Sequence, residues 1–399
     1  MRTMHTTDTS RLSLSPTTSL ALAIWAGLMA LVVVACDGSP ASAPSESTNT
    51  RQRSQQQAPR GTKGEFVKVG EMKETRQSYA AILLPDGRVL LAGGRGGTGH
   101  DRTIVQKNAE VFDPVSGTWQ RAGEFQIERA YLGIAALSDG RVLVAGGEGY
   151  HNQVTNSADL YNPADASWTA TGSMGKTRSQ FPLIALEDGR VIAVGGRDSA
   201  LKLLASVEVF NPETGQWSEI ASMSAPRAFH TATLLQDGRV LVVGGGGVEG
   251  PYLKTAELYD PATATWSPAG TMSTGRALHT ATLLADGRVL VVGGKGKLTS
   301  AEIYDPTTGT WEPAGNTSQP RAEHAATLLS DGRVLVAGGL GNLASVEVFD
   351  PASGTWSAEA DMTLPRYRFV VITLKDGRVL APGGQSTEAV LAISEVFTP

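Results

Sequence analysis

The chain has 399 residues, of which 34 are Lys or Arg and 39 are Asp or Glu, giving a formal net charge of −5 at pH 7. Charged residues make up only 18% of the sequence and form no basic run, so the electrostatic footprint of a nucleic-acid-binding protein is missing. The single cysteine, Cys36, argues against a disulfide framework and against thiol chemistry in the rest of the chain.

Residues 1–35 are predicted to be a lipoprotein signal peptide. Arg2 and Arg11 precede sixteen uncharged, mainly apolar residues from Leu20 to Ala35, a length typical of a signal-peptide h-region and short for a membrane-spanning helix. The run ends in VVVAC, which resembles a bacterial lipobox, so we expect Cys36 to be acylated and to attach the chain to the inner or outer membrane. An ordinary signal peptide followed by a chance cysteine is the alternative.

Residues 36–63 are predicted to be a flexible tether. This segment is rich in Ser, Pro, Gln and Thr and nearly devoid of large apolar residues, so it cannot form a packed core. Together with the lipid expected on Cys36, this tether predicts a protein held at the bacterial cell envelope.

Residues 64–399 contain seven copies of one repeat. Asp-Gly-Arg-Val recurs at intervals of 45 to 53 residues, and a glycine doublet follows each copy. The first residues of the copies are Asp86, Asp139, Asp188, Asp237, Asp286, Asp331 and Asp376. A period of this size predicts a repeat architecture.

One repeat encodes four short antiparallel strands, a to d. In the copy that starts at Gly275, HTATLL and RVLVVGG are separated by Ala-Asp-Gly, a hairpin signal, and AEIYDP and GTWEPAG follow. No segment shows a helical period, so the fold is predicted to be all-β. The run VLVVGG is apolar without alternation, which indicates a sheet covered on both faces, as in the radially stacked blades of a β-propeller.

Further anchors recur in each repeat and carry a family resemblance. A tryptophan stands ten residues before an arginine, as in Trp119 and Arg129, and that arginine stands ten residues before the Asp of Asp-Gly-Arg. Together with Tyr or Phe in strand c, these residues resemble the Kelch repeat over residues 64–399. The resemblance implies a seven-bladed Kelch-type β-propeller of four-stranded blades, and we expect it to be monomeric.

The last blade is predicted to be closed by the N-terminal strand. Residues 64–399 contain seven Asp-Gly-Arg hairpins but only six tryptophans. The last copy of the repeat stops one strand short, after SEVFTP. Phe66 lies ten residues before Arg76 and therefore occupies the tryptophan register. The segment GEFVKVGEM is thus expected to supply the missing strand and to remove the exposed edges of an open array.

Three patterns that resemble functional motifs are not interpreted as sites. GRGGTG at Gly94 and GGGVEG at Gly245 match a dinucleotide-binding pattern but lack the helix that it requires, so no cofactor is expected. His230, His279 and His324 occupy one repeat position that elsewhere holds Tyr, Leu or Phe, which predicts packing and no metal site. The arginines from Arg76 to Arg366 are predicted to pair with an acid in strand c, and the Asp-Gly-Arg arginines are expected to compete for the same acids.

Function is expected where the repeat is broken. The b–c loops vary in length, and in a blade they emerge at the same end as the d–a connections, forming one variable face on a rigid ring. We predict that ligand-binding residues lie on this face, and the candidates are Arg95, His100, Arg102, Tyr150, His151, Arg197, Tyr252, Lys295 and Arg368. This mixture of aromatic and cationic groups suits anionic or carbohydrate ligands.

Two classes of function remain open. The first is a lipid-anchored binding or scaffold module for a protein or carbohydrate, and the second is a carbohydrate-active enzyme similar to a Kelch-type sialic-acid epimerase. No catalytic constellation can be assigned from the sequence. Galactose oxidase also has a Kelch propeller, but its copper site needs a cysteine cross-linked to tyrosine, and this sequence has no cysteine after Cys36.

Overall fold

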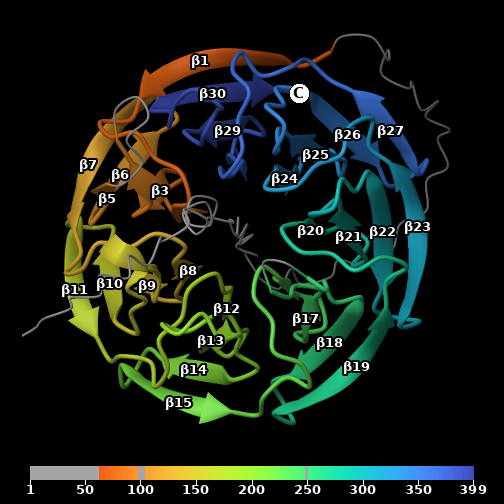
Figure 1. Cartoon of the computed structure of the whole chain (residues 1–399). Coiled ribbons are helices and arrows are strands. Elements are labelled where there is room, and N and C mark those ends of the chain that lie inside the picture. The colour runs from red at the N-terminus through yellow and green to blue at the C-terminus, as the bar shows by residue number, and fades with distance from the viewer. Residues whose placement is uncertain (1–62, 98–103, 248–249) are drawn as a thin grey trace, which may run out of the picture.

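The computed structural model describes residues 63–97, 104–247 and 250–399, which form seven four-stranded sheets arranged radially around a central axis (Figure 1). Cys36, the signal peptide and all of the tether except Lys63 lie outside the described residues. Within the described ranges, no helix has the length and apolar character needed to cross a bilayer. The prediction of an all-β propeller with seven blades is confirmed.

Each blade consists of strands a, b, c and d, counted from the axis outwards. Blade one contains β2 (Ala80–Leu83), β3 (Val89–Ala92), β6 (Asn108–Asp113) and β7 (Thr118–Glu124). Blade two contains β8 (Gly133–Ala136), β9 (Val142–Ala145), β10 (Ala158–Asn162) and β11 (Ser167–Thr171). Blade three contains β12 (Leu183–Ala185), β13 (Val191–Val194), β14 (Val207–Asn211) and β15 (Gln216–Ile220).

The other blades follow the same order. Blade four contains β16 (Thr231–Leu234), β17 (Val240–Val243), β18 (Thr255–Asp260) and β19 (Thr265–Thr271). Blade five contains β20 (Thr280–Leu283), β21 (Val289–Val292), β22 (Ser300–Asp305) and β23 (Thr310–Asn316). Blade six contains β24 (Ala325–Leu328), β25 (Val334–Ala337), β26 (Val346–Asp350) and β27 (Thr355–Ala358). Blade seven contains β28 (Ile372–Thr373), β29 (Val379–Pro382), β30 (Ile393–Thr398) and β1 (Glu65–Glu71).

The glycine doublet at the end of strand b joins each blade to the next. In blade two, the N–H of Gly147 donates to the carbonyl oxygen of Arg178 in blade three at 2.7 Å. A Cβ on Gly146 would lie 2.5 Å from that same oxygen, and Gly146 has a φ of 62°. Only glycine therefore fits where the two backbones approach this closely. The bond recurs around the ring, and from Gly384 to Arg76 it links blade seven to blade one at 2.8 Å.

The repeat arginines tie together the strands of their own blade. Arg178 donates to the carbonyl oxygen of Gly195 at 2.8 Å and to Glu208 of strand c at 2.8 Å, and both side chains are buried. All seven repeats form this pair, as the sequence predicted. A charge pair buried this deeply is costly to break, because the remaining charge would have neither solvent nor partner.

The predicted competition from the Asp-Gly-Arg arginines is wrong. Arg190 pairs with Asp188 of its own turn at 2.6 Å, and the other six turns do the same. The tight turn sets the carboxylate beside the guanidinium two residues later, at a half-exposed edge of the blade, so these arginines do not reach the buried acids of strand c.

The outer rim is held by tryptophans that bridge neighbouring blades. Trp217 packs against Phe210 across its own blade, with ring centroids 5.1 Å apart. Its indole N–H donates to the carbonyl oxygen of Gly172 in blade two at 2.9 Å. The same pattern recurs at Trp168, Trp266, Trp311 and Trp356.

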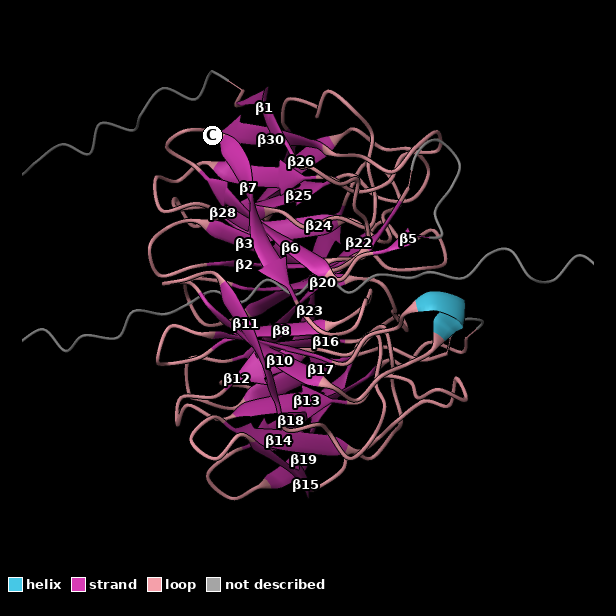
Figure 2. Ribbon diagram, turned by 90° about the vertical axis from the view of Figure 1, so that its left-hand side faces the viewer, coloured by secondary structure: helices cyan, strands magenta, loops and turns pink. Residues whose placement is uncertain are grey.

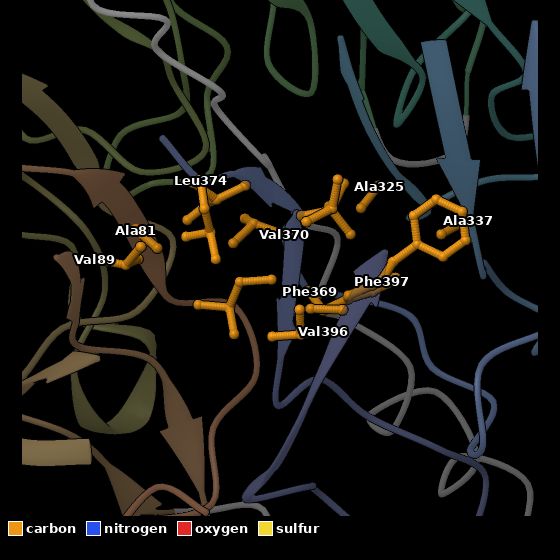
Figure 3. Close-up of a cluster of buried hydrophobic side chains, with 14 of the residues drawn as sticks. Ala81, Val89, Ala325, Ala337, Phe369, Val370, Leu374, Val396 and Phe397 are labelled. Atoms are coloured by element: carbon orange, nitrogen blue, oxygen red, sulfur yellow. The ribbon is translucent and has the colours of Figure 1, made fainter. Parts of the chain in front are cut away.

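The N-terminal strand closes the ring as the sequence predicted. β1 pairs antiparallel with β30, and Phe66 stands directly opposite Phe397 with ring centroids 4.9 Å apart. Behind this pair, side chains of blades six, seven and one form a continuous apolar cluster around Phe369 and Val396 (Figure 3). The two ends of the propeller sequence are therefore joined by both backbone pairing and core packing.

Candidate functional site

The b–c loops and the d–a connections meet on one face of the ring, which we call the loop face. Arg95 of the first b–c loop forms an antiparallel bridge with Gln77, which lies in the d–a connection leading to β2. The short hairpin of β4 (Arg95–Gly96) and β5 (Ile104–Val105) and the 3₁₀ turn η1 (Tyr150–Asn152) belong to these loops. Figure 2 shows β5 and η1 on the same side of the disc.

A ring of seven residues, which we call the axial ring, surrounds the axis at the loop-face end of the innermost strands. Each member stands two residues after a repeat arginine and has a φ between 54° and 58°. The members, in blade order, are Ser78, Tyr131, Gln180, Phe229, Leu278, Glu323 and Arg368. None of them is glycine, although this left-handed backbone region disfavours other residues.

Backbone hydrogen bonds between blades hold the axial ring in place. The N–H of Tyr131 donates to Ser78 at 2.9 Å, and that of Gln180 donates to Tyr131 at 3.0 Å. The N–H of Ser78 donates to Arg368 at 3.3 Å and so joins blade one to blade seven. Because each backbone has the same conformation, the seven side chains project from equivalent places around the axis.

Beside the axial ring, two predicted arginines share one buried carboxylate. Arg95 contacts Glu148 at 3.0 Å and Arg197 contacts its other oxygen at 2.9 Å, so the triad crosses blades one, two and three. The guanidinium of Arg95 also lies 5.6 Å from the centre of the Tyr131 ring. Glu148 is 1% exposed. The sequence alone did not identify Glu148 because the candidates on the loops were aromatic and cationic residues, and Glu148 lies outside the repeated acids of strand c.

A second ion pair lies within the axial ring itself. Arg368 contacts Glu323 at 2.8 Å and donates to the side-chain oxygen of Gln385 at 3.2 Å. Burial raises the pKa of the Glu323 carboxyl to about 7, against the opposing attraction of Arg368. Arg368 was predicted as a ligand-binding residue, whereas Glu323 was missed.

The axial ring has a polar half and an apolar half. Five polar members follow one another on blades six, seven, one, two and three and form what we call the polar half: Glu323, Arg368, Ser78, Tyr131 and Gln180. Phe229 and Leu278, on blades four and five, pack in one apolar cluster with Ala228, Ala277, Ala322, Leu203 and Tyr252. The ring therefore presents hydrogen-bonding groups on one side of the axis and hydrocarbon on the other.

The other predicted residues lie at different distances from this ring. Tyr150 and His151 are exposed in η1, whose Asn152 accepts a hydrogen bond from Arg95 at 3.1 Å. Tyr252 packs against the apolar half, and Lys295 is near enough to Glu323 to lower the pKa of its carboxyl. His100 and Arg102 lie outside the described residues. The structure thus gathers Arg95, Arg197 and Arg368 near the axis and leaves Tyr150 and His151 exposed in η1. Their role in binding remains a prediction.

The three histidines are packed inside the blades. Thr280 shares a hydrogen bond with the Nε2 atom of His324 at 2.9 Å, and Thr231 shares one with His279 at 3.0 Å. Burial lowers the pKa of His279 and His324 to about 3, so both imidazoles are neutral at physiological pH. These contacts agree with the predicted packing role. Among the described residues, no group of three or more His, Cys, Asp or Glu side chains could hold a metal ion.

Comparison with known proteins identifies the family. The model of the KLHDC2/KLHL20/DRC7 Kelch-repeats domain matches residues 183–384, about half of the chain. The chain belongs to this Kelch-repeat family. No curated protein matches the sequence of this Kelch propeller.

Solved structures show the same fold. Among 1038 matching chains is a fungal alcohol oxidase of the AA5 family in complex with copper, with a TM-score of 0.66 and 18% sequence identity. The match covers 85% of this chain and 76% of the oxidase. At this identity the likeness concerns the fold alone. The donor groups in the described part of the Kelch propeller do not fit a copper site, because no three His, Cys, Asp or Glu side chains there lie close enough together to hold a metal ion.

Proposed function

We propose that the protein is a binding module that captures a protein or carbohydrate ligand on the loop face of its Kelch propeller, and that a lipid on Cys36 holds it at the bacterial cell envelope. The observation that carries the proposal is that the side chains that differ from blade to blade are concentrated on this one face. The axial ring with its Arg368–Glu323 pair, the Arg95–Glu148–Arg197 triad beside it and most of the exposed apolar side chains of the described residues all lie there.

Exposed large apolar side chains are unevenly distributed over the described residues. Seven are exposed, and five of them lie on the loop face: Ile104, Ile127, Tyr150, Leu201 and Leu340. The other two are Val67 on the outer strand β1 and Val115 on a turn of the opposite face. Exposed apolar surface concentrated on one face of a protein is typical of interaction sites.

The opposite face has a different character. It carries the seven Asp-Gly-Arg turns, each with its charges paired within the turn. The same paired charges recur in every blade, and a feature present in all seven repeats is typical of the scaffold.

The proposed anchor is compatible with an accessible loop face. β1 ends at Glu71, shortly before Gln77 on the loop face, so its first residue, Glu65, lies towards the opposite face. A lipid attached upstream of Glu65 would therefore be joined to the propeller from that opposite face, through the predicted flexible tether, and would not cover the loop face.

Peptide and glycan arrays probed with the purified full chain test the binding function. We expect selective binding that is lost when Leu201→Asp and Leu340→Asp are combined on the loop face. Val115→Asp is the matched control, because it places the same charge on an exposed apolar site of the opposite face. Equal loss in the control, or no selective binding at all, would refute the loop-face assignment.

Metabolic labelling with a radioactive fatty acid tests the anchor. We expect the wild-type chain to incorporate label in bacterial cells and the Cys36→Ser variant to incorporate none. Label that persists in Cys36→Ser, or wild-type protein that is cleaved but never labelled, would leave an ordinary signal peptide as the correct interpretation.

One observation favours an enzyme as the second candidate. Glu323 holds a carboxyl with a pKa of about 7 at the axis, and a group that titrates near neutrality can both give and take a proton. Turnover of a free sugar by the full chain, lost in Glu323→Gln, would favour this candidate over the binding module.

A further inference from the structure

We propose that the axial ring selects a neutral saccharide, whose hydroxyl groups bond to the polar half while a hydrocarbon face of the sugar packs on the apolar half. The inference rests on the proposed function and names the ligand class of the same loop-face site.

Most of the side chains that could hydrogen-bond to a ligand at the axial ring are uncharged. Neither side-chain atom of Gln180 has a hydrogen-bond partner among the described residues, although this residue is only 1% exposed. The side-chain nitrogen of the buried Gln385 lacks such a partner as well. An amide offers one acceptor and two donor hydrogens, which is the pairing that a hydroxyl group needs, since a hydroxyl both donates and accepts. Ser78 and Tyr131 add two hydroxyls to the same half.

The charged groups, in contrast, already have partners within the protein. Glu148 is shared by Arg95 and Arg197, and Glu323 is paired with Arg368. The three arginines exceed the two carboxylates by one charge, but each arginine contacts a carboxylate. Among these arginines, only the Nε of Arg95 is a buried side-chain nitrogen without a partner in the described part of the chain. A ligand carboxylate would have to compete with two buried carboxylates for these guanidinium groups. A neutral ligand would leave all three contacts intact.

The apolar half offers a surface on which the C–H groups of a sugar can pack. Gln180 and Phe229 are neighbours in the axial ring, on blades three and four, and Leu278 follows on blade five. A pyranose ring carries hydroxyls along its edge and C–H groups on its faces, so one sugar can bond to Gln180 and pack on Phe229. Ligand sites commonly combine an apolar wall with a few fixed polar groups in this way.

Interferometry with immobilised neutral disaccharides and the corresponding uronic acids, using the full chain, tests this assignment. We expect neutral sugars to bind more tightly than their acidic counterparts. Gln180→Leu should weaken neutral-sugar binding by roughly ten-fold, because the sugar hydroxyl is left without its partner. Gln180→Glu should weaken it as well, and Phe229→Ala should weaken it by removing the apolar wall. Gln216→Leu, at an exposed position on the outer strand β15, should change nothing.

The outcomes separate this inference from the proposed function. Tighter binding of the uronic acids, or neutral-sugar binding that Gln180→Leu leaves unchanged in a folded variant, would overturn the neutral-saccharide assignment. Peptide binding without any sugar binding would overturn it too, but would leave the loop-face function standing. If neither peptides nor sugars bind, both proposals fall. Thermal melting of each variant verifies that a loss of binding is not a loss of fold.

Discussion

The repeat arginines and the axial-ring residues stand two positions apart in every blade but follow opposite rules. Arg178 and its six equivalents are the same residue, buried in the same way and paired with a strand-c acid. Gln180 and its six equivalents share one backbone conformation, yet they are seven different residues. Where the backbone and the side chain both repeat, the position builds the scaffold. Where only the backbone repeats, the side chain is available for recognition.

Deleting residues 64–72 should destabilise the propeller more than any single substitution in the scaffold or the axial ring. The deletion removes β1, its pairing with β30 and the Phe66–Phe397 contact, and it exposes both the edge of β30 and the apolar cluster behind it. We expect the melting temperature to fall on the order of 10 °C, measured by calorimetry. A deletion of equal length within the tether, residues 45–53, is the control and should leave the melt unchanged. An unchanged melt in the first variant would mean that closure does not stabilise the ring.

Replacing single residues in blade three tests the two rules directly. Arg178→Leu leaves the buried Glu208 without its charge partner and should lower the free energy of unfolding by about 3–5 kcal/mol. Gln180→Leu removes a side chain that has no partner in the described structure, so its effect on stability should stay within about 1 kcal/mol. Urea denaturation of both variants measures the difference.

Arg190→Leu provides the control for Arg178. It removes the same charge in the same blade, but from a half-exposed pair within one turn, so a loss of about 0–1 kcal/mol is expected. If Arg190→Leu proved as damaging as Arg178→Leu, burial of the ion pair would not be the cause, and the distinction between scaffold and recognition positions would lose its basis.

The scaffold was predictable from the sequence because each of its structural features recurs in all seven repeats. The Asp-Gly turns, the glycine doublets, the arginine–acid pairs and the tryptophan register each recur, so the blade count and the closure by Phe66 followed from spacing alone. The partner of the Asp-Gly-Arg arginines was predicted wrongly, because spacing does not distinguish a buried acid from one in the same turn.

The candidate site was only partly predictable, because its side chains differ from one repeat to the next. Arg95, Arg197 and Arg368 were found as charged residues on irregular loops, but Glu148, Glu323 and Gln180 were not. The signal for Glu323 and Gln180 was present two residues after each repeat arginine. It becomes visible only once these positions are known to share a left-handed backbone around the axis. Convergence of seven distant segments on one axis is a property of the closed ring and of no single repeat.

The pH dependence of stability tests the buried carboxyl of the axial ring. The pKa of Glu323 is raised from 4.5 to about 7 in the folded state, so the folded protein binds the proton more tightly than the unfolded chain. Stability should therefore fall as the pH rises through this window, by a total on the order of 3 kcal/mol. Glu323→Gln cannot ionise and should lack this contribution.

The comparison between wild type and Glu323→Gln isolates this carboxyl from the histidines. The folded-state pKa of His279 and His324 is lowered to about 3, so their contribution to stability is lost as the pH falls below their ordinary value of 6.5, the opposite direction. Subtracting the Glu323→Gln profile from the wild-type profile removes the histidine contribution common to both. Glu312→Gln, exposed on β23, is the matched control. A flat difference between pH 4 and pH 8 would show that Glu323 titrates normally.

The smallest expected effect concerns the outer rim, far from the axial ring. Trp217→Phe keeps an aromatic ring against Phe210 but removes the indole N–H that donates to Gly172 of the neighbouring blade. The loss of one such hydrogen bond should cost about 1 kcal/mol, measured by urea denaturation, and should leave ligand binding unchanged. The N-terminal strand already carries phenylalanine, Phe66, at this register, which indicates that the fold tolerates the change. A Trp217→Phe variant that bound ligand more weakly than wild type while losing no stability would show that the rim takes part in recognition, and the separation between repeated scaffold and variable axis would then be too simple.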